Sequence, residues 1–268
     1  MRSPCASASA RARPLLGTLV EIRVAPGGEP HAVERAFDAV ARVGRLMSIH
    51  DSRSELSAVN RAAHRAPMAV DGWTFDVFRL ALELWRRSAG AFDCVAPLTA
   101  GASSADIELC ATNRIFFRRP LQVDFGGIAK GYAVDRAVDV LLQAGVPSGV
   151  VNAGGDLRVF GGKHEPVHVR LPQGGLLDIG TLAEGALATS INEEHPALGL
   201  PLLDGRGGAP RGARVASVFA ASCALADGLT KAVAALGAHC APLLVHYGAQ
   251  ALCLDPAGRW RRWGAASG

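Results

Sequence analysis

The pattern of apolar and polar positions predicts a chain in which helices and strands are mixed. Apolar residues at three- and four-residue spacing predict amphipathic helices over residues 32–47 and 75–87, and we expect further helices over 129–143 and 221–236. Alternating or uniformly apolar stretches predict strands. Because several strands follow one another between the helices, the pattern favours the α+β class. The predicted strands cover residues 18–24, 121–125, 149–153, 157–160, 167–171, 176–179, 186–190, 214–220, 243–246 and 251–254.

The composition is that of a folded chain with an apolar core. Of the 268 residues, 49% are apolar, and the net charge of +4 is too small to indicate a nucleic-acid partner. We expect a flexible segment over residues 1–12 and one domain over 13–268, with no apolar run long enough to span a bilayer. The first residues lack the apolar centre of a secretory signal and the six cysteines form no CxxC pair, so we expect a cytoplasmic protein.

The first candidate for chemistry is the segment 123–133, where two glycines lie between a predicted strand and a predicted helix. Gly126 and Gly127 allow a ligand to approach the backbone, and the N–H groups that begin the helix favour an anion such as a diphosphate. Lys130 would add a full positive charge. The spacing matches neither a Walker loop nor the GxGxxG fingerprint. The alternative is a tight turn from strand to helix with a surface lysine.

The second candidate is the segment 151–156, where an apolar strand ends in a polar residue, two glycines and a carboxylate. The ends of strands are common ligand sites. A hairpin turn in which Asp156 is the turn-forming residue is an equally good interpretation, because aspartate serves turns well.

The third candidate is Asp227, which lies in an otherwise apolar predicted helix. Its carboxylate must be paired, bound to a metal or placed at the helix edge. It is either a magnesium ligand or the partner of Lys231, one helical turn further on. Among weaker signals, Ser54 and Ser57 would cap a short helix, and His164 with His168 are too few ligands for a convincing metal site.

Taken in this order, the segments resemble the ApbE family, the FAD:protein FMN transferases. The most specific part is DFGGIAKGYAVDRA at 124–137 followed by VNAGGD at 151–156. The resemblance runs from about residue 13 to the C-terminus and implies a T-fold-like α+β architecture of mixed sheets and packed helices. Shorter matches are LLGTLVEI at 15–22, SELSAVN at 54–60, GAFD and APL within 90–98, LATS at 187–190 and ADGL at 226–229.

The resemblance implies a flavin-transfer chemistry. FAD is the substrate, Mg²⁺ polarises its diphosphate, and a threonine hydroxyl of an acceptor flavoprotein attacks the phosphorus on the FMN side. AMP leaves, and FMN stays attached through a phosphoester bond. The implied partners are therefore FAD and an acceptor flavoprotein with a Thr or Ser target.

The resemblance also assigns site residues position by position. The carbonyl of Ala129 and the carboxylate of Asp227 correspond to metal ligands, and Asn60 corresponds to a flavin-site asparagine. The other implied cofactor-binding residues are Gly17, Thr18, Asp124, Gly126, Gly127, Lys130, Asn152, Gly154, Gly155 and Asp156.

The chain departs from the family pattern at two places. Four residues after the metal aspartate the family usually has a threonine ligand, whereas this chain has Lys231, with Thr230 one position early. An ammonium beside Asp227 would compete with Mg²⁺ or partly replace its charge.

The second departure is the loss of the family's histidine pair from the loop before this helix. His195 lies upstream and would serve as the base if the loop folds back, which makes Asp227, Lys231 and His195 the implied catalytic set. These departures keep open an alternative function: a divergent FAD-binding protein that carries flavin or hydrolyses FAD as a pyrophosphatase.

Overall fold

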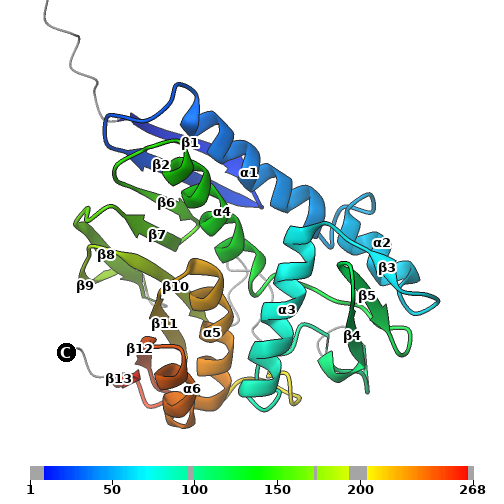
Figure 1. The fold of residues 1–268 in the computed structure, drawn as a ribbon. Coiled ribbons are helices and arrows are strands. Elements are labelled where there is room, and N and C mark those ends of the chain that lie inside the picture. The colour runs from blue at the N-terminus through cyan, green and yellow to red at the C-terminus, as the bar shows by residue number, and fades with distance from the viewer. Residues whose placement is uncertain (1–8, 96–98, 172–173, 193–203, 265–268) are drawn as a thin grey trace, which may run out of the picture.

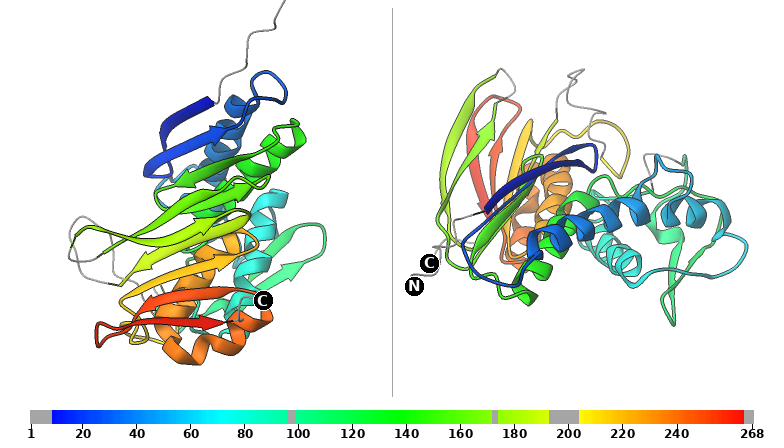
Figure 2. Two further views of the ribbon diagram at one scale, coloured as in Figure 1. Left: turned by 90° about the vertical axis from the view of Figure 1, so that its left-hand side faces the viewer. Right: turned by 90° about the horizontal axis from the view of Figure 1, so that it is seen from above.

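An eight-stranded antiparallel sheet runs through the molecule (Figures 1 and 2). The computed structural model describes residues 9–95, 99–171, 174–192 and 204–264. In spatial order, the strands of this main sheet are β1 (Ser9–Leu15), β2 (Thr18–Val24), β6 (Gly149–Ala153), β7 (Asp156–Phe160), β10 (Gly185–Ile191), β11 (Val215–Ala220), β12 (Gln250–Leu254) and β13 (Trp260–Gly264).

Three long helices cover one face of the main sheet: α1 (Ala32–Met47), α4 (Ala129–Gln143) and α5 (Cys223–Leu236) (Figure 2). The amphipathic pattern of α1 buries Phe37, Val40 and Val43. Helix α4 lies between α1 and α5, and α5 also packs against β10 and β11. This layer brings the first turn of α4 against the start of α5, where the candidate site lies.

A smaller unit packs on the far side of these helices, away from the main sheet (Figure 1). An edge contact between the rings of Phe78 and Phe125, with centroids 4.8 Å apart, joins this unit to the segment before α4. The unit consists of α2 (Glu55–Ala62), α3 (Gly72–Arg87), the short helix η1 (Ser104–Asp106) and a sheet with the order β3 (Met68–Ala69), β5 (Arg114–Phe117), β4 (Ile107–Cys110).

A separate hairpin, β8 (Glu165–Arg170) and β9 (Leu176–Leu182), packs on the main sheet near its C-terminal strands. A small apolar cluster of Val169, Val215 and Leu254 makes this contact. Two short helices, η2 (Gly237–Cys240) and α6 (Ala241–His246), follow α5 and lead into β12.

The arrangement confirms the α+β class and most predicted elements. The helices at 32–47 and 129–143 and the strands at 18–24 and 149–153 have the predicted bounds. Ser54 caps α2 as expected, since its hydroxyl accepts a hydrogen bond from the backbone N–H of Ser57 at 3.0 Å.

Three predictions about elements were wrong. Residues 243–246 belong to α6 and not to a strand, because a short apolar run does not distinguish the two. Residues 121–125 form no strand, because the backbone of Val123 hydrogen-bonds to the side chain of Asn60 and not to a neighbouring strand. Residues 9–12, assigned to a flexible segment, form part of β1 and pair with residues 21–24 of β2, while residues 1–8 lie outside the described chain.

The stretch Cys223–His246 is long and apolar enough to cross a membrane, by length and composition alone. The expectation that no apolar run has this length was therefore wrong. Of its most apolar window, 61% is buried inside the protein, as in the core helix of a globular domain. No second stretch of this kind occurs among the described residues.

Candidate functional site

The segments that the sequence marked as candidates converge where α4 and α5 begin. Lys130, in the first turn of α4, forms an ion pair with Asp156 at the start of β7. Lys231, in α5, forms an ion pair with Asp227 one turn earlier in the same helix. The two pairs interact electrostatically with each other, so they form one cluster of two carboxylates and two ammonium groups. We call Lys130, Asp156, Asp227 and Lys231 the charge cluster.

The carboxylate of Asp227 occupies the N-terminus of α4. Its Oδ2 accepts a hydrogen bond from the backbone N–H of Gly131 at 3.2 Å, while Oδ1 faces the Lys231 ammonium. The N–H groups of Ile128 and Ala129 donate to the carbonyl of Phe125 at 2.9 and 2.8 Å. The anion at this helix terminus is therefore the protein's own carboxylate, in the place where we expected a diphosphate.

Burial and neighbouring charges set the ionisation of the charge cluster. Burial alone would raise the pKa of Asp227, but the ammonium groups of Lys231 and Lys130 outweigh it and lower that pKa. Burial and the charge of Asp227 raise the pKa of Asp156, although Lys130 lies beside it. The two carboxylates raise the pKa of Lys130 against the effect of its burial. With all four groups ionised, the cluster has no net charge.

The segment 151–156 is both a hairpin turn and a part of the site. Gly154 and Gly155 form the two-residue turn between β6 and β7, with φ of +64° and +103°. The N–H of Gly155 donates to the side chain of Asn152 at 2.9 Å. Asp156 does not form the turn; it is 2% exposed and pairs with Lys130.

The β1–β2 turn places Thr18 against this hairpin. Leu16 and Gly17 both have positive φ, as a two-residue hairpin turn requires, so Gly17 serves the turn. A Cβ on Gly154 would lie 2.5 Å from the hydroxyl of Thr18. Residue 154 must therefore be glycine for both its φ and its proximity to Thr18.

A cavity of about 560 Å³ opens at this point. Of the predicted residues, Thr18, Lys130, Asn152, Gly154 and Gly155 line it. The other lining residues were not assigned to this site from the sequence, although His168 was considered as half of a weak metal pair: Leu19, Glu21, His168, Arg170, Leu176, Thr189 and Ile191.

Most of these residues come from strands whose register the sequence does not specify. His168 and Arg170 lie on β8, two residues apart, and so on one face of that strand. Their alternation with buried Val167 and Val169 is the signal that could have marked them as a solvent-facing pair. Nothing in the sequence indicates that β8 lies next to the β6–β7 turn.

Gly126 and Gly127 are not among the residues that line the cavity. A Cβ on Gly127 would lie 3.3 Å from Cε of Lys231, so the side chain of Lys231 packs on this glycine. The N–H of Gly126 donates to Oδ1 of Asp124 at 2.8 Å in a local turn. The space beside Gly127 is thus filled by the protein's own side chain, while Asn152, Gly154 and Gly155 line the open cavity.

Asn60 fixes the segment that leads into α4. Its side-chain amide donates to the carbonyl of Val123 at 3.0 Å and its carbonyl accepts from the N–H of Val123 at 2.9 Å. A flavin contact of Asn60 stays a prediction; the structure gives this residue a positioning role. His195 lies outside the described residues, so its role as a base stays a prediction as well.

Replacing Asn60 by alanine is expected to lower the free energy of unfolding by about 1–3 kcal/mol, because both backbone groups of Val123 lose their partner. Urea unfolding followed by circular dichroism measures this loss. Asn192→Ala removes, among the described residues, one side-chain bond, to the carbonyl of Pro210, and is expected to cost less. An equal loss in both variants would show that Asn60 has no special role in placing the loop.

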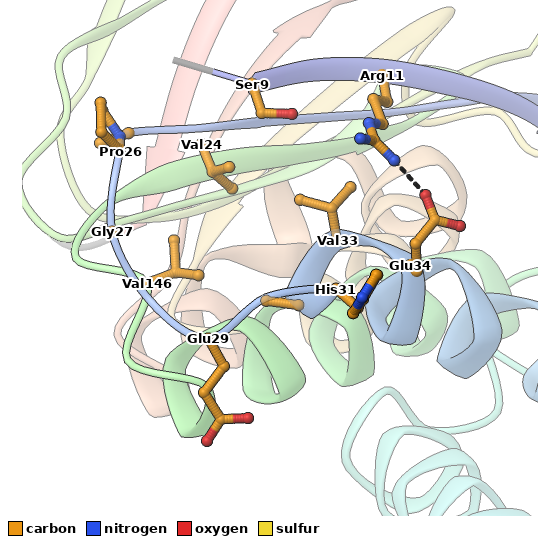
Figure 3. A pocket seen from close by; sticks show the side chains of 12 residues that line it. Ser9, Arg11, Val24, Pro26, Gly27, Glu29, His31, Val33, Glu34 and Val146 are labelled. Atoms are coloured by element: carbon orange, nitrogen blue, oxygen red, sulfur yellow. Dashed lines mark hydrogen bonds and ion pairs between the residues drawn. The ribbon is translucent and has the colours of Figure 1, made fainter. Parts of the chain in front are cut away.

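A second hollow, of about 230 Å³, lies between β1, the 25–31 turn and the start of α1 (Figure 3). The ion pair of Arg11 with Glu34 borders it (Figure 3). It is lined by none of the residues that the sequence analysis assigned to the site.

Comparison with known proteins decides the family. The family model described as the ApbE family matches residues 16–253. The chain belongs to the ApbE family. The predicted resemblance is therefore confirmed, and its two specific motifs supply Lys130 and Asp156 of the charge cluster.

Named ApbE relatives align over different shares of their length. The FAD:protein FMN transferase of Treponema pallidum (strain Nichols) is 27% identical over 191 residues, 59% of this chain and 53% of that protein. The FAD:protein FMN transferase of Vibrio cholerae serotype O1 is 27% identical over 267 residues, 84% of this chain and 80% of that protein. The chain thus spans about half the length of the Treponema relative, and 54% of one from Klebsiella pneumoniae (strain 342).

Solved ApbE structures share the fold. The ApbE protein of Thermotoga maritima superposes with a TM-score of 0.83 at 24% identity, and covers 96% of this chain and 97% of its own. The flavin transferase ApbE of Vibrio cholerae superposes with a TM-score of 0.80 at 20% identity, with 96% of each chain covered.

The residues at the ApbE metal position of this chain do not fit Mg²⁺. Both oxygens of Asp227 already accept hydrogen bonds, and its side chain is 0% exposed. The Thr230 hydroxyl bonds instead to Ser190 at 2.6 Å and to the carbonyl of Asp227 at 2.7 Å. Among the described residues, no three His, Cys, Asp or Glu side chains gather as a metal site. Ala129 lies in the first turn of α4, and its role as a carbonyl ligand stays a prediction.

Proposed function

We propose that this chain is an FAD:protein FMN transferase, which moves FMN from FAD to a hydroxyl group of an acceptor flavoprotein. The observation that carries the proposal is the cavity of about 560 Å³ at the β6–β7 turn, with Lys130 and Arg170 in its lining. The membership in the ApbE family and the names of the relatives support the same activity.

The lining of the cavity matches the two chemically different parts of FAD. The positive side chains of Lys130 and Arg170 and the backbone of Gly154 and Gly155 suit an anionic diphosphate. Leu19 and Leu176 line the same cavity and are 52% and 66% exposed, which leaves an apolar surface for a flat ring system.

The proposed reaction breaks and forms one phosphorus–oxygen bond. The acceptor hydroxyl oxygen bonds to the phosphorus on the FMN side, the bond from that phosphorus to the bridging oxygen breaks, and AMP leaves with that oxygen. One proton from the hydroxyl is released. Lys130 and Arg170 would hold the diphosphate oxygens while their charge shifts toward AMP.

The test combines the purified protein, FAD and an acceptor domain that contains a target threonine. We expect a covalently bound, fluorescent flavin on the denatured acceptor and one AMP released for each flavin attached. An acceptor without the target hydroxyl is the control and should stay unlabelled. Release of AMP without labelling would replace the proposal with an FAD pyrophosphatase, and bound but unchanged FAD would replace it with a flavin carrier.

From the sequence we further propose a Thr or Ser target in the acceptor and a cytoplasmic location. Mg²⁺, which the family resemblance implied, is not part of the proposal, because the residues around Asp227 do not fit it.

A further inference from the structure

The position of Lys231 has a consequence for the cation requirement of the site. Its ammonium lies against Oδ1 of Asp227, and its side chain is only 16% exposed. The aliphatic part packs on Gly127, where a Cβ would lie 3.3 Å from Cε. The side chain of Lys231 is therefore held in a fixed place between α5 and the 126–127 turn.

The carboxylate of Asp227 leaves no room for a metal ion. Mg²⁺ needs an octahedral set of oxygen ligands and usually keeps several waters. Asp227 is inaccessible to solvent, and its oxygens are used by Lys231 and by the N–H of Gly131. A divalent ion at this carboxylate would have to break the buried ion pair with the Lys231 ammonium and give up most of its own waters.

Within the charge cluster, the ammonium group that faces the cavity is that of Lys130. Lys130 lines the cavity, and it interacts with both carboxylates of the cluster. Lys231 neutralises Asp227, so that the carboxylate does not repel an anion bound beside Lys130. A lysine ammonium is a compact point charge and is suited to this task.

We propose that Lys231 is the built-in cation of this site and that the protein binds FAD without a divalent metal ion. This inference rests on the proposed function, because it concerns the same diphosphate site. It excludes Asp227 as a metal ligand in the wild-type chain.

The first experiment measures FAD binding to the full chain by flavin fluorescence, in EDTA and in excess Mg²⁺. We expect the two dissociation constants to agree within about twofold. Binding that appears only with Mg²⁺ would overturn the inference and leave the proposed function intact. No binding of FAD in either condition would count against the proposed function instead.

The second experiment needs no FAD and therefore judges the inference separately. Mn²⁺ binding is measured by electron paramagnetic resonance on the wild type, on Lys231→Thr and on Lys163→Thr. We expect no specific Mn²⁺ binding to the wild type, and at least about tenfold tighter binding to Lys231→Thr, which supplies an oxygen and frees Asp227. Lys163, which lies near Glu165 at 3.8 Å, is the matched control and should behave as the wild type.

Tight Mn²⁺ binding to the wild type would overturn the inference even if Lys231→Thr failed to fold. A folded Lys231→Thr that gains no Mn²⁺ binding would also contradict it, because Asp227 would then be no metal ligand with or without the lysine.

Discussion

Replacing Gly131 by alanine is expected to destabilise the protein by about 3 kcal/mol or more, at the upper end of the cost of overpacking. A Cβ at this position would lie 2.5 Å from the backbone carbon of Cys223 and 2.8 Å from the backbone nitrogen of Ala224. All of these atoms are backbone, so no side chain can move aside. Helix propensity predicts the opposite sign, a gain of about 1 kcal/mol, because Gly131 lies within α4.

The clash would also separate groups that hold α4 and α5 together. The carboxylate of Asp135, in α4, accepts hydrogen bonds from the N–H groups of Cys223 and Ala224 at 2.9 and 2.8 Å. The N–H of Gly131 itself donates to Asp227. The variant should therefore lose FAD binding together with stability, since Lys130 is the neighbouring residue.

Urea unfolding of Gly131→Ala is compared with that of Gly44→Ala. Gly44 also lies inside a helix, α1, but the nearest atom to a Cβ there is the end of the Leu16 side chain at 3.2 Å. We expect Gly44→Ala to be neutral or stabilising by up to about 1 kcal/mol. Similar stability of both variants would show that the α4–α5 contact is looser than described.

Local patterns in the sequence predicted local structure well. The bounds of α1 and α4 follow from apolar periodicity, and the cap of α2 follows from Ser54. The i,i+4 spacing of Asp227 and Lys231 allowed either an ion pair or a metal ligand, and the structure has the ion pair.

Contacts between distant segments were not predictable in the same way. Lys130 and Asp156 are 26 residues apart, and only the placement of β7 beside α4 pairs them. The segment 121–125 has strand-like composition, yet the side chain of Asn60 takes both backbone groups of Val123. Periodicity describes one element at a time, whereas these outcomes depend on which elements meet.

The family motifs correctly located the site, but they did not show which groups occupy its two glycine segments. The 124–137 motif suggested a diphosphate at the start of α4, where the structure has the carboxylate of Asp227. The 151–156 motif faces the cavity as expected. The difference arises because an anion at a helix terminus is equally stabilised whether it belongs to a ligand or to the chain.

Asp227→Asn is expected to lower the free energy of unfolding by about 3–5 kcal/mol, the usual cost of removing one partner from a buried ion pair. The substitution leaves Lys231 and Lys130 with the single carboxylate of Asp156, and it weakens the interaction with the N-terminus of α4. Chemical unfolding in EDTA measures the loss without interference from metal ions.

An exposed ion pair serves as the control, because it shows how much stability is lost when a charge is removed without burial. Glu108→Gln removes an ion pair with Arg118 in which both side chains are exposed, and should change stability by less than about 0.5 kcal/mol. If Asp227→Asn cost no more than this, the charge cluster would contribute nothing to the fold.

The double variant Asp227→Asn with Lys231→Met decides whether the two residues act as a pair. Removing both charges leaves Lys130 with Asp156, so the cluster is neutral again. We expect the double variant to be more stable than Asp227→Asn alone, with a coupling energy of about 1–3 kcal/mol between the two substitutions. If the stability losses of the two single variants simply added, Lys231 would not compensate the charge of the buried Asp227 carboxylate. Lys231 would then not act as the cation of this site.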